Sequence, residues 1–286
     1  MYDLIIIGGG PAAAAAGVYA ARKKIKTLLI AESFGGQSLV SQDIQNWIGT
    51  VSISGYDLGQ AFEAHLRAQE GIEIVTGELV KTVSKGEGVF TVVTEGGKQY
   101  ETKTVLVTTG GRRKKLGVLG EKEFDGKGVA YCSICDAPLF GGKVVAVVGG
   151  GNAGLEAVID LLPYATKIYL LQRSGVLKGD AVTQERIAQD PKVEVIFNAT
   201  TSEIHGDSFV NGLTYEDTNT KDGFDKLTTG KHKLDVQGVF IEIGTLPNSE
   251  LVKDIVTTTP YGEIEVDVYG KTPMQGIWAA GDVTSL

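Results

Sequence analysis

The stretch LIIIGGGPAAAAA, residues 4–16, determines how the chain begins to fold. Its apolar start, residues 4–7, predicts a buried strand, the three glycines predict a tight turn, and residues 12–22 predict a helix. Residues 27–31 form a second apolar run, which we predict to be a strand parallel to the first. The beginning of the chain is therefore expected to be a β-α-β unit.

The same stretch is apolar enough to resemble a signal peptide or a membrane span. A signal peptide carries positive charge before its apolar core, whereas Asp3 precedes this one. Glycines and Pro11 also divide the run into pieces shorter than a span requires. We therefore expect neither a signal peptide nor a membrane span.

The net charge of −8, from 35 acidic and 27 basic residues, argues against nucleic acid or an anionic membrane as the main partner.

The opening arrangement is repeated in the middle of the chain. Residues 143–148 predict a strand, the glycines at 149–151 a turn, residues 153–162 a helix and residues 167–171 another strand. Elsewhere, residues 72–94 alternate apolar and polar side chains and predict an antiparallel meander, and residues 104–109 and 276–280 predict further strands. A polar, β-rich stretch reaches to about residue 240. A chain of 286 residues is long enough for two cores.

The first glycine turn has the G-x-G-x-x-A form at Gly8, Gly10 and Ala13, directly after a strand and at the start of a helix. Glycines let the backbone approach a pyrophosphate, whose charge is held by free N–H groups and the helix dipole. Glu32 ends the second strand, where an acid can bind the ribose hydroxyls of a dinucleotide. The alternative is a glycine-rich turn with no ligand.

The second turn has the G-x-G-x-x-G form at Gly149, Gly151 and Gly154, which predicts a second dinucleotide and so the combination of FAD with NAD(P)H. Gln172 and Arg173 end the following strand. An acid there favours NADH and a cluster of arginines favours NADPH, but this sequence has one arginine and no acid. Both nucleotides stay open, as does a solvated Arg173 with no ligand role.

The two cysteines of the chain, Cys132 and Cys135, are three residues apart. This spacing allows a small disulfide ring whose thiolate can attack a partner disulfide. Zinc is the alternative, but it needs four ligands and the three histidines are scattered, so we expect no metal. So few cysteines suit a reducing compartment, which predicts a cytosolic protein. Asp136 could exchange a proton with the neighbouring thiol, or could merely cap a helix or turn.

In this order, the motifs resemble the low-molecular-weight thioredoxin reductases, and equally the reductase core of the flavoprotein subunit of alkyl hydroperoxide reductase. The likeness covers the whole chain. It is carried by residues 34–37, 43–47, 108–110, 132–140, 244–248 and 279–282. The details at residues 32–37 and 138–140 look more like the hydroperoxide-reductase branch.

The resemblance implies an α/β fold with two Rossmann-like dinucleotide-binding domains, each of three layers (ββα), one inserted in the other. Residues 1–115 and 244–286 would form the FAD-binding domain, and residues 116–243 the NAD(P)H-binding domain that carries the cysteines. The hinges would lie near residues 113–115 and 244–245. The family also has a helix after the position of Asp282, whereas this sequence ends at Leu286.

The resemblance also implies site residues. FAD would contact Gly8, Gly10, Pro11, Ala12, Glu32, Gly36, Gln37, Asn46, Gly110, Gly281 and Asp282, and NAD(P)H would contact Gly149, Gly151, Asn152, Ala153 and Arg173. Cys135 would lie against the flavin, Cys132 would attack the protein substrate, and Asp136 would serve as acid and base.

The activity implied is that of an FAD-dependent NAD(P)H:protein-disulfide oxidoreductase, expected to be a homodimer. Its disulfide substrate would be thioredoxin, a glutaredoxin-like protein or a peroxiredoxin. One alternative keeps the dithiol chemistry but takes electrons from ferredoxin. Another is a non-catalytic, flavin-bound redox sensor, because the same two cysteines would serve either role.

Overall fold

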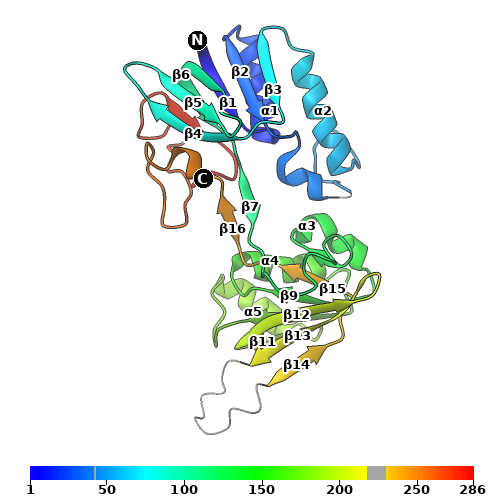
Figure 1. Ribbon diagram of the computed structural model, residues 1–286. Helices are drawn as coiled ribbons and strands as arrows, with labels where there is room; N and C mark the ends of the chain where they lie inside the picture. The colour runs from blue at the N-terminus through cyan, green and yellow to red at the C-terminus, as the bar shows by residue number, and fades with distance from the viewer. Residues whose placement is uncertain (42, 218–229) are drawn as a thin grey trace. The chain divides into compact units, whose positions relative to one another are not determined.

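The computed structural model describes residues 1–41, 43–217 and 230–286, which form two compact units (Figure 1). Unit 1 comprises Met1–Arg112 and Thr245–Leu286, and unit 2 comprises Arg113–Gly244. Unit 2 therefore begins three residues before, and ends one residue after, the inserted domain proposed from the sequence. The chain passes between the units through two paired strands, β7 (Gly111–Arg113) and β16 (Thr245–Pro247).

Unit 1 is built on a parallel sheet that begins with the predicted β-α-β unit. In the order of the sheet its parallel strands are β3 (Ile72–Thr76), β2 (Thr27–Ala31), β1 (Tyr2–Ile7), β6 (Gln99–Val107) and β17 (Ile277–Ala279). Leu4 lies opposite Thr27, so the predicted parallel pairing of the first two strands is confirmed.

The predicted antiparallel meander at residues 72–94 is partly wrong. Strand β3 pairs in parallel with β2, and only β4 (Val80–Lys85) and β5 (Phe90–Thr94) form an antiparallel extension from β6. The error has a physical reason. Strand β3 is the edge of the sheet and is only half covered, so it alternates apolar and polar residues as an antiparallel strand does.

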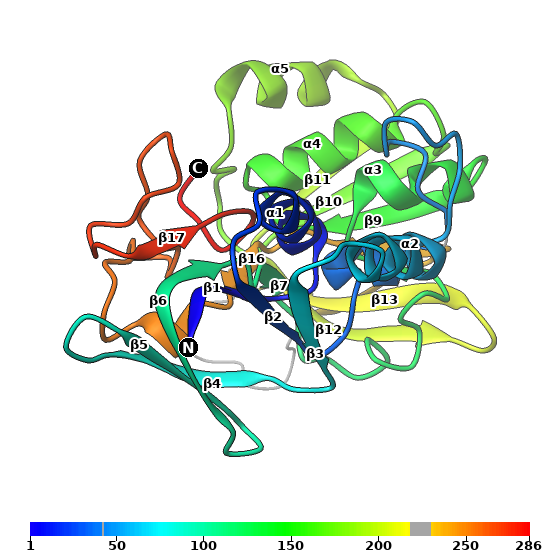
Figure 2. The same cartoon turned by 90° about the horizontal axis from the view of Figure 1, so that it is seen from above.

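Two layers cover the sheet of unit 1. Helices α1 (Pro11–Arg22) and α2 (Gly55–Arg67) pack on one face, where Leu66 and Leu29 belong to one buried core (Figure 2). The other face is covered by β4, β5 and the C-terminal part of the chain, with Phe90 and Ile264 in its core. The unit therefore has the predicted ββα layering.

Unit 2 has the same layering around a second parallel sheet. Its strands, in order, are β11 (Val193–Phe197), β10 (Lys167–Gln172), β9 (Val144–Val148), β15 (Gly238–Ile241) and β8 (Val129–Ala130). Helices α4 (Asn152–Leu161) and α5 (Ala181–Gln189) cover one face. The antiparallel strands β12 (Ala199–Gly206), β13 (Val210–Asp217) and β14 (Lys231–Leu234) cover the other (Figure 2).

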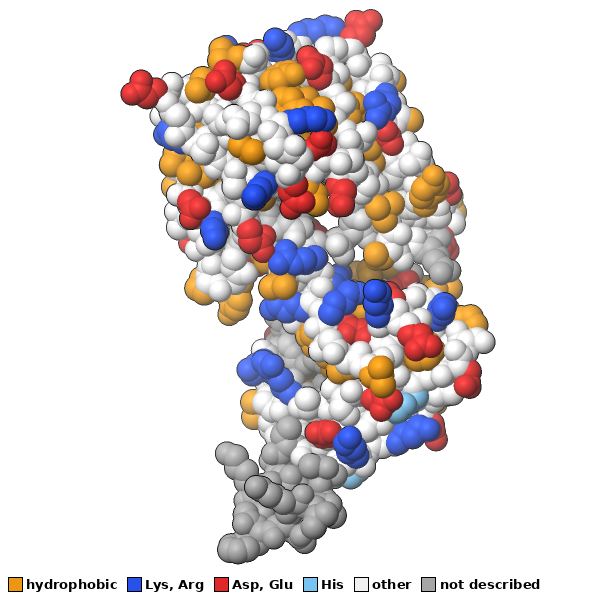
Figure 3. All heavy atoms as spheres, viewed as in Figure 1, with side chains coloured by type: hydrophobic (Ala, Val, Ile, Leu, Met, Phe, Trp, Pro, Cys, Tyr) orange, Lys and Arg blue, Asp and Glu red, His pale blue; other side chains and the backbone are white. Residues whose placement is uncertain are grey.

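Both layered sheets support the fold class predicted from the sequence. Part of the predicted β-rich stretch, residues 218–229, lies outside the described residues. In the described part of the chain, every helix is too short or too polar to cross a membrane. Acidic and basic side chains are interspersed over the face of the molecule that Figure 3 shows.

Candidate functional site

The first glycine turn is pressed against the ends of two strands of unit 1. Gly8 has a φ of +127°, and a Cβ there would collide with the carbonyl oxygen of Thr108 just after β6. A Cβ at Gly9 would collide with the carbonyl oxygen of Ser33 just after β2. Glycine is therefore required at both positions, and the backbone of the turn stays uncovered by side chains.

The helix that follows this turn begins without a side-chain cap. Gly10 is its N-cap and Pro11 its first residue, and a glycine has no side chain to accept from the first turn. By contrast, Ser54 caps α2 and Asp180 caps α5 through their side-chain oxygens. The N–H groups of the first turn of α1 are thus left for an anion, as the pyrophosphate of a dinucleotide requires.

Several of the predicted FAD residues meet at this helix start. A Cβ on Gly36 would lie 3.2 Å from the Cα of Gly10, and one on Gly281 would lie 3.3 Å from the Cβ of Ala12. The residue after Gly281 is Asp282, which is exposed. Residues from three distant parts of the sequence therefore surround one uncapped helix, in a cradle that fits the diphosphate of FAD.

Of the other predicted FAD residues, Glu32, Gln37 and Asn46 are exposed, and Gly110 is half-buried. Glu32 directly follows β2, Gln37 lies in the short helix η1 (Gly36–Val40), and Gly110 accepts a hydrogen bond from the N–H of Asn248 at 2.9 Å. Asn46 lies in a loop closed by the pairing of Ile44 with Ile53. The contacts of the described residues do not bring Asn46 to the glycine turn.

The second glycine turn repeats this geometry in unit 2. Gly149 has a φ of +123°, and a Cβ on Gly154 would collide with the carbonyl oxygen of Gly149, so the helix packs closely on the turn. Gly151 is the N-cap of α4 and again offers no side chain. A Cβ on Gly151 would meet nothing within 4 Å, which leaves open space over the start of α4. The site fits a second dinucleotide.

The other residues predicted for this site have different surroundings. The side-chain oxygen of Asn152 accepts a hydrogen bond from the N–H of Asp180 at 2.8 Å, so it holds the loop before α5. Gln172, the last residue of β10, is buried, and its amide nitrogen donates to Ser174 Oγ at 2.8 Å and to the carbonyl oxygen of Val176 at 2.9 Å. Arg173, the next residue, is exposed.

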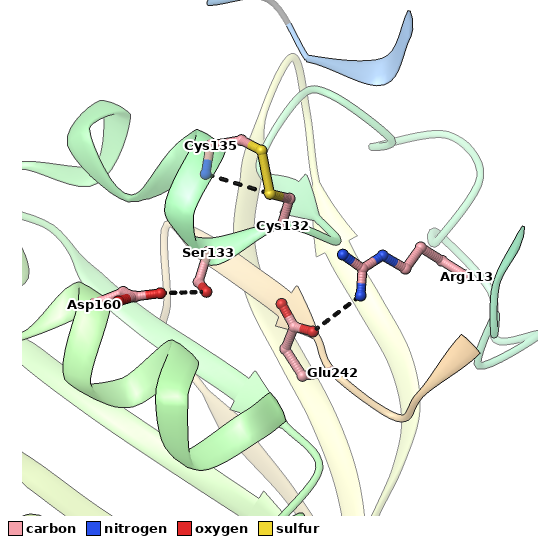
Figure 4. The surroundings of a disulfide bond; sticks show 6 residues. All are labelled: Arg113, Cys132, Ser133, Cys135, Asp160 and Glu242. Carbon is pink, nitrogen blue, oxygen red and sulfur yellow. Dashed lines mark hydrogen bonds and ion pairs between the residues drawn. A yellow bond between two sulfur atoms is a disulfide. The ribbon is translucent and has the colours of Figure 1, made fainter. Parts of the chain in front are cut away.

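Cys132 and Cys135 form a disulfide bond at the start of the short helix α3 (Ser133–Asp136), as Figure 4 shows. Their Cα atoms are 5.3 Å apart. Cys132 is the N-cap of this helix, and its Sγ accepts a hydrogen bond from the N–H of Cys135 at 3.3 Å. Both cysteines are partly exposed. A thiolate at Cys132 would be stabilised in this position, because helix N–H groups favour negative charge.

Three carboxyl groups lie around the disulfide. Burial raises the pKa of Asp136, the last residue of α3, to about 6. Asp160 on α4 accepts a hydrogen bond from Ser133 Oγ at 2.7 Å (Figure 4). Burial also raises the pKa of Glu242 to about 7, although Arg113 and the N–H of Ser133 oppose that rise. Two of the three groups can therefore bind or release a proton near neutral pH.

Sequence reasoning missed Glu242, Arg113 and Asp160. A signal for the first was present, because Glu242 is the one acid in the apolar segment GVFIEIG, residues 238–244. Arg113 and Asp160 carry no such local signal, since only folding brings them to the disulfide. Within residues 1–41, 43–217 and 230–286, no group of three or more His, Cys, Asp or Glu could hold a metal ion.

Comparisons with known proteins give relatives of two kinds. The chain is 43% identical over 290 residues to an alkyl hydroperoxide reductase subunit of Pseudomonas aeruginosa, covering 100% of this chain and 54% of that protein. It is 42% identical over 283 residues to a protein of Bacillus subtilis named NADH dehydrogenase, covering 99% and 54%. The chain thus spans about half the length of the curated relatives it matches.

Solved structures agree with the observed fold. Thioredoxin reductase of Streptococcus pyogenes MGAS5005 matches with a TM-score of 0.85 and 33% identity, over 100% of this chain and 90% of that one. Thioredoxin reductase of Giardia duodenalis matches with a TM-score of 0.84 and 27% identity, over 99% and 91%.

The model of one protein family, pyridine nucleotide-disulphide oxidoreductase, matches residues 2–286. The two uncapped glycine turns and the disulfide are what this family's chemistry needs. The chain belongs to the pyridine nucleotide-disulphide oxidoreductase family, and its cofactors are FAD and a nicotinamide dinucleotide, NADH or NADPH.

Proposed function

We propose that this chain is an FAD-dependent NAD(P)H:protein-disulfide oxidoreductase that passes two electrons through its Cys132–Cys135 disulfide to a small redox protein. One observation carries the proposal. The disulfide is partly exposed and starts helix α3 in unit 2, the same unit that holds the second uncapped glycine turn. The proposed site of the electron donor and the disulfide that would accept the electrons therefore belong to the same unit.

Each unit has a proposed cofactor. The Gly8–Gly10 turn with Pro11, Ala12, Gly36 and Gly281 would hold the diphosphate of FAD in unit 1, with Glu32, Gln37, Asn46, Gly110 and Asp282 as further contacts. The Gly149–Gly151 turn with Asn152, Ala153 and Arg173 would hold NAD(P)H in unit 2. Bound FAD supplies a carrier that takes two electrons from the nicotinamide and gives them to a disulfide.

The protein's own groups manage the thiols and protons. Reduction of the Cys132–Cys135 disulfide takes two electrons and two protons and gives two thiols. Cys132, at the N-cap of α3, would then attack the disulfide of the partner, and Cys135 would close the ring again as the partner leaves as a dithiol. Asp136 would give and accept a proton in these steps, because its raised pKa keeps part of it protonated near pH 6.

The partner is proposed to be thioredoxin, a glutaredoxin-like protein or a peroxiredoxin. The names of the relatives support this range, since they include alkyl hydroperoxide reductase and thioredoxin reductases. A second candidate is suggested by the relative named NADH dehydrogenase. In that case electrons would leave the flavin for an acceptor other than the disulfide.

A ferredoxin donor or a purely sensory role is less well supported. Either would leave the second glycine turn without a ligand, yet that turn retains an uncapped helix with open space at Gly151. A homodimeric assembly and a cytosolic location are further proposals that rest on the resemblance and on cysteine usage.

The test is anaerobic mixing of the FAD-loaded protein with NADH, and separately with NADPH, while flavin absorbance is followed by stopped flow. We expect bleaching, followed by reoxidation when a disulfide acceptor such as thioredoxin is added. Bleaching without disulfide reduction would favour the NADH dehydrogenase candidate. No bleaching by either nucleotide, in protein that dithionite reduces, would reject both and favour a ferredoxin donor or a sensor.

A further inference from the structure

Glu242 is a buried carboxylate beside the redox helix. It follows β15 directly, and its side chain is only 5% exposed. Figure 4 shows its carboxyl group pointing toward Cys132 and Ser133, the N-cap and the first residue of α3. The backbone N–H of Ser133 acts on this carboxyl group and favours its ionised form.

The charges around Glu242 are unbalanced. One guanidinium nitrogen of Arg113 lies 3.8 Å from Glu242 Oε2, and Arg113 is itself one-third exposed. Two other carboxyl groups act on Glu242 as well, Asp160 on α4, which Figure 4 shows, and Asp136 on α3, and both raise its pKa. A thiolate at Cys132 would add a further negative charge to this group.

A buried cluster relieves such an excess of negative charge by binding a proton. Burial is the main reason that the pKa of Glu242 is raised to about 7 while the disulfide is intact. A nearby thiolate would raise this pKa further, because like charges disfavour ionisation of both groups. The two groups would then titrate as a coupled pair.

We propose that Glu242 is a positioning residue of the redox pair, taking up a proton when Cys132 becomes a thiolate and releasing it when that charge leaves. The inference rests on the proposed disulfide-exchange function. In the first step Cys132–SH and Glu242–COO⁻ become Cys132–S⁻ and Glu242–COOH, with no electron transferred. In the second, Cys132–S⁻ forms the mixed disulfide, the partner's leaving sulfur takes the negative charge and then a proton through Asp136, and the proton that Glu242 releases balances that transfer.

The test measures the titration of Cys132 directly. In the full-length, FAD-loaded chain with Cys135→Ser, Cys132 is the single cysteine. The rate of its alkylation by iodoacetamide is followed from pH 5 to 10, with Glu242 or with Glu242→Gln. We expect a broad titration with Glu242, because two coupled groups share it. With the permanently neutral glutamine we expect one sharp step, whose midpoint is lower by about one pH unit.

The pH at which the variants differ is also diagnostic. Near pH 6, Glu242 is mostly protonated and resembles glutamine, so the two alkylation rates should nearly coincide. Between pH 7 and 9 the glutamine variant should react faster, because ionised Glu242 no longer opposes the thiolate. An unchanged or raised midpoint in Glu242→Gln would overturn the inference.

Matched variants separate this effect from a loss of structure. Glu242→Asp keeps a carboxyl group and should retain the broad titration. Glu121→Gln is the control, since Glu121 is also buried in unit 2 but accepts from the N–H groups of Leu116 and Gly117 and from the hydroxyl of Tyr131. It should leave the titration of Cys132 unchanged. An equal shift in Glu121→Gln would overturn the inference by showing a general loosening of unit 2.

Infrared spectroscopy gives a readout that does not depend on a folded glutamine variant. A protonated carboxyl stretching band of the Cys135→Ser protein should disappear between pH 6 and 9 and should shift in Glu242→Asp. Absence of any such band would overturn the inference. These titrations need neither NAD(P)H nor a partner protein, so their failure is distinguishable from a failure of flavin bleaching, which would reject the proposed function itself.

Discussion

The side-chain oxygen of Gln172 accepts a hydrogen bond from the backbone N–H of Gly150 at 3.2 Å. The amide of Gln172 is therefore tied to the middle of the second glycine turn and, through its nitrogen, to the loop that follows β10. This is the strand end where an acid would select NADH. Because the amide there is buried and neutral, we propose that discrimination between the two nucleotides depends on the exposed Arg173.

Replacing Arg173 with alanine should therefore affect one nucleotide selectively. We expect KM for NADPH to rise about tenfold, as the loss of a hydrogen bond to a charged group implies, while KM for NADH stays the same. Steady-state flavin reduction with each nucleotide measures this. An equal rise for both would show that Arg173 supports the loop and does not bind the 2′-phosphate.

Gly154 should tolerate no side chain. Gly154→Ala places a Cβ against the carbonyl oxygen of Gly149 and should lower the free energy of unfolding by about 1–3 kcal/mol. Gly151→Ala is the matched control, because its Cβ meets nothing within 4 Å and its φ is −91°. The control should keep the stability of the free protein and lose nucleotide affinity. Urea unfolding and nucleotide titration distinguish the two, and equal stability losses would contradict the packing argument.

Asp136 should make stability depend on pH. Burial raises its pKa to about 6, so the folded protein disfavours the ionised form. The resulting loss of stability is absent below about pH 4, develops between pH 4 and 6 and is complete above pH 6. Asp136→Asn should therefore gain stability over the oxidised parent protein as the pH rises from 4 to 7.5, measured by urea unfolding.

A matched variant should show the opposite slope. The N–H of Thr183 donates to Asp180 at 2.8 Å and lowers the pKa of this exposed helix cap. Asp180→Asn should therefore lose its stability deficit as the pH falls through that lowered pKa. A pH-independent difference for Asp136→Asn would contradict the assignment of its raised pKa.

Cys132→Ser and Cys135→Ser should separate the two halves of the proposed reaction. Each change removes the disulfide but leaves both glycine turns intact, so NADH or NADPH should still bleach the flavin. Reduction of a protein disulfide should be abolished in both variants, because one sulfur alone cannot complete the exchange. Disulfide reduction that persisted in either variant would show that electrons reach the partner by another route.

The parts of the fold that the sequence predicts have local signals. The first strand ends at Ile7 and the first helix at Arg22 in the structure, as predicted, because glycines and an apolar run mark these boundaries. The pairing predicted for strand β3 from the sequence is wrong, because tertiary packing determines that β3 lies beside β2 and runs parallel to it. A half-buried edge strand has the same alternation in either direction.

The site divides in the same way. The glycines and cysteines can be predicted because their spacing has a chemical meaning. Arg113 cannot be predicted. Glu242 stands out as a lone acid in an apolar segment, but its role cannot be predicted either, since both residues depend on partners that are far away in the chain. Ser133 precedes Glu242 by more than a hundred residues. In the sequence, Gln172 is noticeable only because the position where an acid would favour NADH carries none. Its hydrogen bond with the N–H of Gly150 depends on the folded loop.

The two glycine N-caps mean that the protein without its cofactors lacks some of the stability that capped helices would give it. Helices α1 and α4 lack the side-chain caps that α2 and α5 carry, and such a cap contributes about 1 kcal/mol. A ligand that binds at these helix starts adds its binding free energy to the stability of the folded protein. When the ligand concentration is a hundred times the dissociation constant, this contribution is about 2.7 kcal/mol. The lifetime of the protein against proteases should consequently follow the supply of riboflavin in the cell that makes it.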